Sequence, residues 1–170
     1  MNELWDVYDR FRQKTGMVIE RNSKDRLEPG EFHIVATGVI VNSKNQILIS
    51  RRNPKKKLFP NLWECNGGSV ILGENSLLAA IREINEEIGV TLKATEGKFL
   101  GTVQQNDYFR DVWKFAKDLD LSSLKFNDGE VVEVRWVTEE EYRQMFLDKR
   151  IIPTGDCIID LLEKEREWDR

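Results

Sequence analysis

The sequence feature that most restricts the fold is the stretch GENSLLAAIREINEEIGV, residues 73–90. Its pattern predicts a helix from Ser76 to Ile88, with Gly89 as the C-terminal stop. At about 100° per residue, four apolar side chains share one narrow stripe: Leu77, Ile81, Ile84 and Ile88. We expect this stripe to be the buried face of the helix.

Three carboxylates crowd the same helix: Glu83, Glu86 and Glu87. We place them on a second stripe, roughly opposite the apolar one, with Ala79 and Ala80 leaving space on the acidic side. A solvated face is the ordinary interpretation of such residues. However, Glu83 and Glu87 are like charges at i, i+4, in the half of the helix where its dipole disfavours negative charge. These penalties indicate a compensating hard cation, Mg²⁺ or Mn²⁺.

The remaining pattern predicts a mixed sheet. Ile34–Val41 and Gln46–Ser50 flank the turn sequence NSKN and form a predicted hairpin. Thr138 and Glu141 form a capping box at the start of a second helix. Further strands are expected in KFLGTVQQ, YFRDVWKFAKDL and EVVEVRWVT, and a last helix in GDCIIDLLEKEREW. We therefore expect an α/β fold with helices on both sides of the sheet, or α+β if the strands are mostly antiparallel.

The N-terminal part predicts an arm, residues 1–33, before a single domain, residues 34–170. Apolar positions within residues 3–14 recur at roughly helical spacing, which indicates a short amphipathic segment. Residues 16–33 are polar and contain the turn sequence EPGE. Two roles for the arm stay open: it shapes a pocket, or it forms the interface of a homodimer.

Composition excludes several classes of function. The net charge of −4 does not predict binding to nucleic acid. No apolar run reaches the length of a membrane span, and the N-terminus lacks a signal-peptide core. Cys65 and Cys157 match no metal-site spacing, so we expect reduced thiols in a cytoplasmic protein. His33, the only histidine, is expected to be structural.

The segment GSVILGENSLLAAIREINEEIGV, residues 68–90, resembles the Nudix box, G-x5-E-x7-R-E-U-x-E-E-x-G-U, where U is aliphatic. The flanking PNLW and VRWVTEEE are also similar to the family. The resemblance implies a Nudix-type mixed sheet between helices. All defined positions of the box are filled: Gly68, Glu74, Arg82, Glu83, Ile84, Glu86, Glu87, Gly89 and Val90.

The resemblance also implies roles for these residues, starting with the metal. Glu86 and Glu87 are expected to be the main ligands of Mg²⁺ or Mn²⁺. Glu83 is expected to be a further ligand or the base that activates water. The carbonyl of Gly67 is a candidate for an additional ligand. Two residues would position the others: Arg82, by salt bridges to the glutamates, and Glu74, by hydrogen bonds in the loop.

Outside the box, the family pattern calls for one more acid, for which the candidates are Glu130 and Glu133. Residues three apart on a strand face opposite sides, so only one can reach the metal, and we favour Glu130. The basic run after the predicted hairpin, with Arg51 and Arg52, is either a solvated loop or a source of phosphate contacts. Trp63 is a candidate for stacking on a base, although core packing is the commoner use of such a residue.

These expectations favour a metal-dependent hydrolase that cleaves a diphosphate linkage in a nucleoside diphosphate derivative, a small-molecule substrate. Two alternatives stay open. An isopentenyl-diphosphate isomerase would need a catalytic cysteine near Asn66, and Cys65 would face the other way. A non-catalytic nucleotide sensor would more typically lack a box glutamate, and none is missing here.

Overall fold

The computed structural model describes residues 3–21, 27–126 and 129–168. Three short 3-10 helices, at Ala94–Glu96, Leu121–Ser123 and Pro153–Gly155, connect the larger elements. The α-helices are α1 (Ser76–Ile88), α2 (Glu139–Leu147) and α3 (Cys157–Trp168). The strands are β1 (Leu4–Tyr8), β2 (Lys14–Glu20), β3 (His33–Val41), β4 (Ile47–Arg52), β5 (Trp63–Glu64), β6 (Gly67–Ser69), β7 (Gly97–Gln104), β8 (Tyr108–Ala116) and β9 (Val131–Val137).

Seven strands form one mixed sheet in the order β5-β4-β3-β8-β7, with β6 paired to β3 and β9 paired to β4. Strands β3 and β8 run parallel along their whole length, from His33 opposite Tyr108 to Val41 opposite Ala116. The other pairs in this sheet are antiparallel. The predicted hairpin is present: β3 and β4 meet at Val41 and Ile47. The mixed sheet is therefore confirmed, and its mostly antiparallel pairs make the fold α+β.

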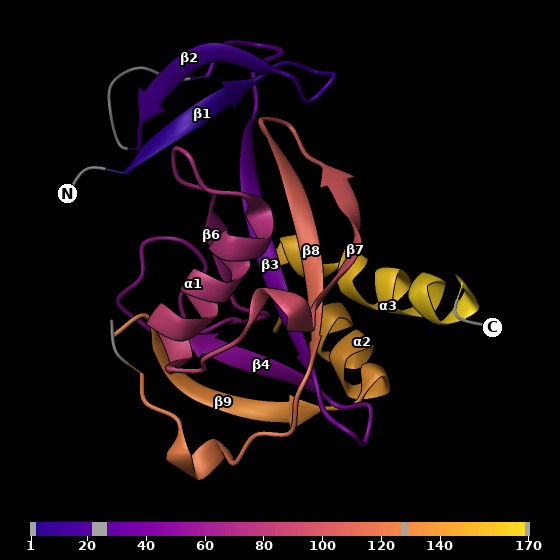
Figure 1. Ribbon diagram of the computed structural model, residues 1–170. Helices are drawn as coiled ribbons and strands as arrows, with labels where there is room; N and C mark the ends of the chain where they lie inside the picture. The colour runs from indigo at the N-terminus through magenta and orange to yellow at the C-terminus, as the bar shows by residue number, and fades with distance from the viewer. Residues whose placement is uncertain (1–2, 22–26, 127–128, 169–170) are drawn as a thin grey trace.

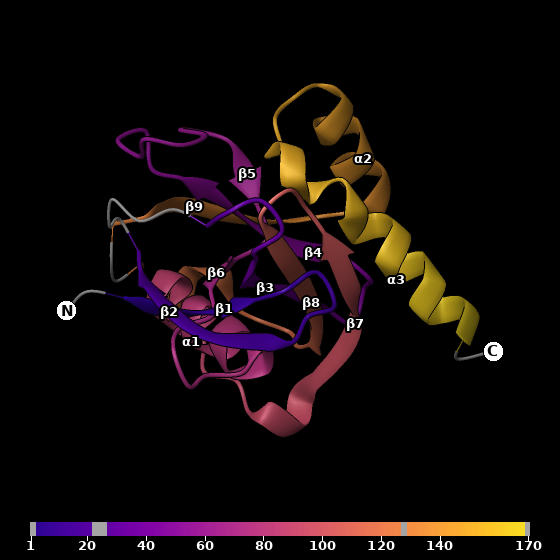
Figure 2. The same ribbon diagram turned by 90° about the horizontal axis from the view of Figure 1, so that it is seen from above.

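Helices cover both faces of this sheet, α1 on one side and α2 with α3 on the other (Figures 1 and 2). Side chains alternate along β3 accordingly. Ala36 and Ile40 belong to the core beneath α1, whereas Val39 and Val41 belong to the core beneath α2 and α3. Because both faces are buried, the strand reads as a nearly continuous apolar run rather than as an alternating one.

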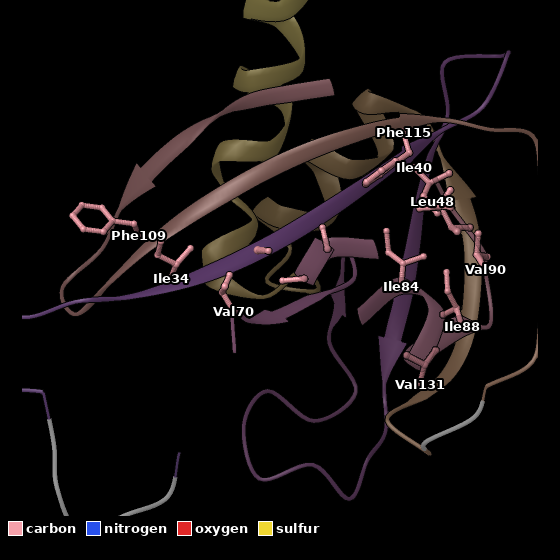
Figure 3. Packing of buried hydrophobic residues seen from close by; sticks show 14 of the residues in the cluster. Ile34, Ile40, Leu48, Val70, Ile84, Ile88, Val90, Phe109, Phe115 and Val131 are labelled. Carbon is pink, nitrogen blue, oxygen red and sulfur yellow. The ribbon is translucent and has the colours of Figure 1, made fainter. Parts of the chain in front are cut away.

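The stripe predicted on α1 packs into the core as expected, and Figure 3 shows two of its members, Ile84 and Ile88, among the core side chains. Ile84 and Ile88 are fully buried, and Leu77 and Ile81 pack against the same core while partly exposed. A side chain at Gly38 of β3 would overlap Ile84, so this glycine lets the helix approach the sheet. The helix also ends as predicted, because Gly89 adopts the left-handed conformation with φ of 72°.

The predicted arrangement of the other side of α1 is wrong. Ala79 and Ala80 are fully buried instead of leaving space, and Glu87 is only 4% exposed. At about 100° per residue, Glu87 lies about 60° from Ile84 around the helix, beside the apolar stripe and not opposite it. Glu86, in contrast, points to solvent. Of these two acids of the helix, Glu87 therefore points into the protein and Glu86 does not.

The second helix begins as its sequence predicts. The Thr138 hydroxyl accepts a hydrogen bond from the Glu141 backbone N–H at 3.1 Å. The Glu141 carboxylate accepts one from the Thr138 N–H at 2.7 Å, which completes the capping box. Both cysteines are free, Cys65 buried and Cys157 partly buried. None of the helices in the described part of the chain is long and apolar enough to cross a membrane.

The N-terminal segment is a β-hairpin, not the amphipathic segment of helical spacing that we expected for residues 3–14. β1 and β2 pair antiparallel as a separate two-stranded sheet, seen above the ends of β3 and β8 in Figure 1. Trp5 lies opposite Ile19, and Tyr8 lies opposite Lys14. The backbone groups of β1 are satisfied by a strand that comes later in the sequence and is itself mostly exposed. The apolar spacing of β1 alone does not reveal that partner.

Candidate functional site

The loop before α1 brings strand β6 unusually close to the helix. β6 pairs with β3, with Gly67 opposite Thr37 and Gly68 opposite Ala36. A side chain at Gly68 would overlap the carboxylate of Glu83, and one at Gly67 would overlap the Ala36 backbone. Packing against backbone therefore requires Gly67, whereas a side chain at Gly68 would displace the Glu83 carboxylate. This close approach puts the backbone of β6 beside the acidic side of α1.

Arg82 connects the box carboxylates. Its guanidinium donates to both oxygens of Glu74 at 3.1 Å, to Glu83 at 2.7 Å and to Glu86 at 3.1 Å. It also donates to the backbone carbonyl of Ser69 at 3.0 Å. Burial alone would lower the pKa of Arg82, but hydrogen bonds with Glu74 and the charge of Glu83 raise it. Arg82 therefore stays charged and holds these three acids in place.

Glu87 lies deepest in the cluster. Its Oε2 accepts a hydrogen bond of 2.5 Å from Nδ2 of Asn66, which also donates to Oγ of Ser50 at 3.1 Å. Burial raises the pKa of Glu87 well above its ordinary value, and the negative charge of Glu64 adds to this effect. Burial likewise raises the pKa of Glu83, although Arg82 opposes the shift. Keeping both carboxylates ionised therefore costs free energy in the metal-free protein.

These groups open onto one cleft of about 290 Å³, which contains most of the residues proposed from the sequence. It combines carboxylates, cations and glycine backbone. Its lining consists of Glu3, Arg21, Arg52, Lys56, Gly67, Gly68, Glu83, Glu86, Glu87 and Glu130.

Only one of the two candidates for an additional acid lines the cleft. Glu130, just before β9, lines the cleft and forms an ion pair with Lys56. Glu133 lies outside the lining of the cleft and pairs with Arg51 at 2.9 Å. The structure therefore places Glu130 in the same cleft as Glu83, Glu86 and Glu87.

The three predicted substrate contacts do not share the cleft. Arg52 lines the cleft, where it pairs with Glu64 at 2.5 Å. Arg51, its neighbour on β4, lies outside that lining and sits 6.0 Å from the ring of Trp63. Trp63 itself is buried in the core beneath α2 and α3. Since successive residues of a strand face opposite sides, only Arg52 of these three reaches the cleft.

Oxygen ligands suit a hard divalent cation, and the cleft supplies them. Within the described ranges, no three His, Cys, Asp or Glu side chains already surround one point. Arg82 bridges Glu83 and Glu86 instead, while the partner of Glu87 is the neutral Asn66. A cation beside Glu87 would offset the cost of burying its charge. The oxygen donors of this cleft therefore suit Mg²⁺ or Mn²⁺ by their chemistry.

Sequence reasoning missed four residues of this site. Asn66 and Glu64 precede the box, and their contacts with Glu87 and Arg52 depend on the packing of β4, β5 and α1. Glu3 and Arg21 reach the cleft from the N-terminal hairpin. A single sequence carries no local signal for any of these contacts, because each joins segments far apart in the chain.

Comparisons with known proteins agree with this architecture. Residues 31–157 match the NUDIX domain. An uncharacterized Nudix hydrolase of Listeria monocytogenes is 38% identical over 154 residues, which cover 89% of each protein. An isopentenyl-diphosphate Delta-isomerase of Escherichia coli is 30% identical over 111 residues, covering 62% of this chain and 61% of the isomerase. The crystal structure of DR0079 from Deinococcus radiodurans has a TM-score of 0.76 at 24% identity, covering 95% of this chain and 98% of the other.

The mixed sheet between helices, with the acidic helix packed on a glycine-containing strand, defines a NUDIX-domain protein. From the domain match and the similarity to the Listeria protein, the chain belongs to the Nudix hydrolase family. The resemblance read from residues 68–90 is thereby confirmed.

Proposed function

We propose that this protein is a metal-dependent hydrolase that cleaves the diphosphate linkage of a nucleoside diphosphate derivative. The observation that carries the proposal is the shared cleft, which is lined by Glu83, Glu86, Glu87 and Glu130 together with three cationic side chains. Carboxylates that can hold divalent ions, next to cations that can bind phosphate, suit a substrate with densely packed negative charge.

Glu86 and Glu87 are the proposed main ligands of Mg²⁺ or Mn²⁺, with Glu83, Glu130 and the Gly67 carbonyl as further candidates. When bound, the metal neutralises phosphate charge and lowers the pKa of water. Asn66 orients the Glu87 carboxylate by donating a hydrogen bond to its Oε2. These assignments rest on the family pattern and on the common cleft that the residues share.

The proposed reaction is an attack of water on one phosphorus of the diphosphate. A new P–O bond forms to the water oxygen, and the bond from that phosphorus to the bridging oxygen breaks. Glu83, where it is not a ligand, is the candidate base that takes the water proton, since its carboxylate lies in the cleft. Arg82 keeps Glu83 in place through the 2.7 Å ion pair, and Glu74 in turn holds Arg82 from the other side.

The isomerase alternative is disfavoured by the residue at position 66. The isomerases are expected to have a catalytic cysteine there, whereas this chain has Asn66, whose amide donates a hydrogen bond to Glu87. The neighbouring Cys65 is buried in the core beneath α2 and α3. Burial raises the pKa of its thiol to about 12, so it is protonated at neutral pH.

Other parts of the proposal extend to the whole chain. We assign residues 1–33 to an arm and residues 34–170 to the hydrolase domain. We also assign the protein to the cytoplasm, consistent with its free cysteines.

No nucleic-acid partner is expected. Assembly into a homodimer through the hairpin is testable by sedimentation analysis, and Phe11, Met17 and Val18 are exposed apolar side chains there.

The function is tested by incubating the purified protein with a panel of diphosphate substrates and Mg²⁺ or Mn²⁺. The panel includes nucleoside di- and triphosphates, nucleotide sugars, dinucleoside polyphosphates and ADP-ribose. We expect release of nucleoside monophosphate from at least one substrate, and none after addition of EDTA. Thermal unfolding with increasing Mg²⁺ is a second measurement, because a ligand that binds the folded state raises the melting temperature. A melting temperature that rises with Mg²⁺, with no turnover of any substrate, would favour the sensor.

A further inference from the structure

The N-terminal hairpin supplies two charged side chains to the cleft, Glu3 before β1 and Arg21 after β2. They lie next to each other because β1 and β2 are antiparallel: the Arg21 N–H donates to the Glu3 carbonyl at 2.8 Å. Their side chains form an ion pair of 2.7 Å. The hairpin therefore brings a guanidinium to the same space as the box glutamates.

Contacts with the main sheet hold the hairpin over the cleft. Tyr8 and Phe32 exchange two backbone hydrogen bonds, at 2.7 and 2.8 Å. The Leu4 carbonyl accepts a bond of 2.7 Å from the Leu72 N–H, in the loop that leads to α1. Arg12 in the hairpin turn forms an ion pair with the buried Asp111 of β8. Arg21 is thus attached to a docked element and not to a free tail.

The three cations in the described lining of the cleft differ in how firmly they are held. Arg52 pairs with Glu64, both largely buried, and also donates to the Leu58 carbonyl at 3.0 and 3.1 Å. Lys56 pairs with Glu130. Arg21 pairs with Glu3, and their side chains are 48% and 41% exposed.

An ion pair this exposed contributes little to stability. Exchanging it for another anion is therefore inexpensive. A phosphate is a stronger partner, because guanidinium can bind its oxygens through two parallel hydrogen bonds. Of the three cations, Arg21 is the one whose present partner is easiest to replace.

We propose that Arg21 is a substrate-binding residue, which releases Glu3 and binds a phosphate of the diphosphate substrate. This inference rests on the proposed function of the cleft. It makes the hairpin part of the active site and answers the open question about the arm in favour of shaping the pocket. Arg21 would contact only a phosphate of the substrate, so the binding free energy from this contact should not depend on the group attached to the diphosphate.

The test measures binding of methylenediphosphonate, a diphosphate analogue that cannot be hydrolysed, by calorimetry with Mg²⁺. We expect Arg21→Gln to weaken this binding about tenfold or more, because it removes the charged bidentate donor, and Arg21→Lys to restore part of it, because lysine keeps the charge. The matched control is Arg10→Gln, which removes an arginine from the same hairpin outside the lining of the cleft. For any substrate found in the panel, the KM should rise in Arg21→Gln more than the kcat falls.

A second variant separates phosphate binding from a purely structural ion pair. Glu3→Gln removes the partner of Arg21 but keeps the guanidinium, so binding should hold or become tighter. If Glu3→Gln weakens analogue binding as much as Arg21→Gln does, Arg21 acts only through the hairpin and the proposal is wrong. It is also wrong if Arg21→Gln binds like the wild type, or if the wild type does not bind the analogue. If analogue binding depends on Arg21 but no substrate is turned over, the proposed hydrolase function is wrong and the proposed contact between Arg21 and phosphate stands.

Discussion

At the scale of single residues, Glu87 shows how the site resolves competing demands. The residue is 4% exposed, and its carboxylate accepts a hydrogen bond from Asn66. Burying a charge is costly unless it is paired, and like charges nearby raise the cost. The neutral amide satisfies one oxygen without neutralising the charge. A cation beside Glu87 would therefore relieve a larger cost of buried charge than one beside the exposed Glu86.

We expect Glu87→Gln to abolish most activity while leaving the fold intact. Glutamine keeps the size and one carbonyl oxygen but loses the charge that binds a hard cation. The kcat should fall by at least about a hundredfold, or roughly 2.7 kcal/mol of transition-state stabilisation. The metal-free protein should be as stable as the wild type or slightly more stable, because a buried charge is removed.

The measurements are kcat, Mg²⁺ affinity and the denaturation midpoint without metal. Glu140→Gln, an exposed carboxylate on α2, is the matched control. Near-wild-type kcat and Mg²⁺ dependence in Glu87→Gln on a confirmed substrate would contradict the assignment of the metal site.

At the scale of elements, α1 has two tasks that lie side by side on its surface. Ile84 and Ile88 pack into the core, while Glu87 and Glu83 face the cleft. The orientation of the carboxylates therefore depends on how the apolar stripe packs. Gly38 in β3 permits this close packing.

Ile84→Ala should lower the free energy of unfolding by about 2–5 kcal/mol, from lost burial and the cavity that remains. Leu78→Ala is the control on the same helix, since Leu78 is 46% exposed and should have little effect. Both are measured by chemical denaturation. A midpoint for Ile84→Ala near that of the wild type would mean that α1 packs in another orientation.

At the scale of the whole molecule, two sheets meet at His33. The ring of Trp5 from the hairpin stacks on His33 at 4.4 Å with an angle of 9°. The Nδ1 of His33 lies 3.2 Å from the Asp107 carbonyl. Burial lowers the pKa of His33, and the positive charge of Arg21 lowers it further. The hydrogen bond with the Asp107 carbonyl opposes this shift by raising the pKa. This buried ring thus joins the hairpin to the domain in its neutral form.

The lowered pKa predicts how stability changes with pH. Below the ordinary value of 6.5, the unfolded chain binds a proton more readily at His33 than the folded protein does. Stability contributed by the neutral ring is therefore complete above that value and is lost as the pH falls towards the lowered pKa. His33→Phe keeps a flat ring for Trp5 but cannot titrate.

Between pH 7 and pH 5, the wild type should consequently lose more unfolding free energy than His33→Phe. At pH 7 the variant should be about 1 kcal/mol less stable, from the lost hydrogen bond. Urea denaturation at several pH values measures both quantities. Parallel curves for the two proteins would show that His33 does not contribute to the pH dependence.

Much of the local structure and the core of the candidate site was accessible from the sequence. The bounds of α1, its stop at Gly89 and the capping box at Thr138 follow from hydrogen bonds and side-chain spacing within a few residues. The glutamates of the box, with Arg82, share a local pattern for the same reason. Such short-range interactions can be predicted from the local sequence, because the residues that make them are only a few positions apart.

Other features were decided by contacts between distant segments. Leu4–Tyr8 is a strand because Lys14–Glu20 pairs with it, although its apolar spacing suggested a different segment. Trp63 lies in the core and Arg52 in the cleft because of the register of β4 and β5. The docking of the hairpin brings Arg21 to the glutamates of α1. These placements depend on long-range packing and strand register, which no local pattern of one sequence encodes.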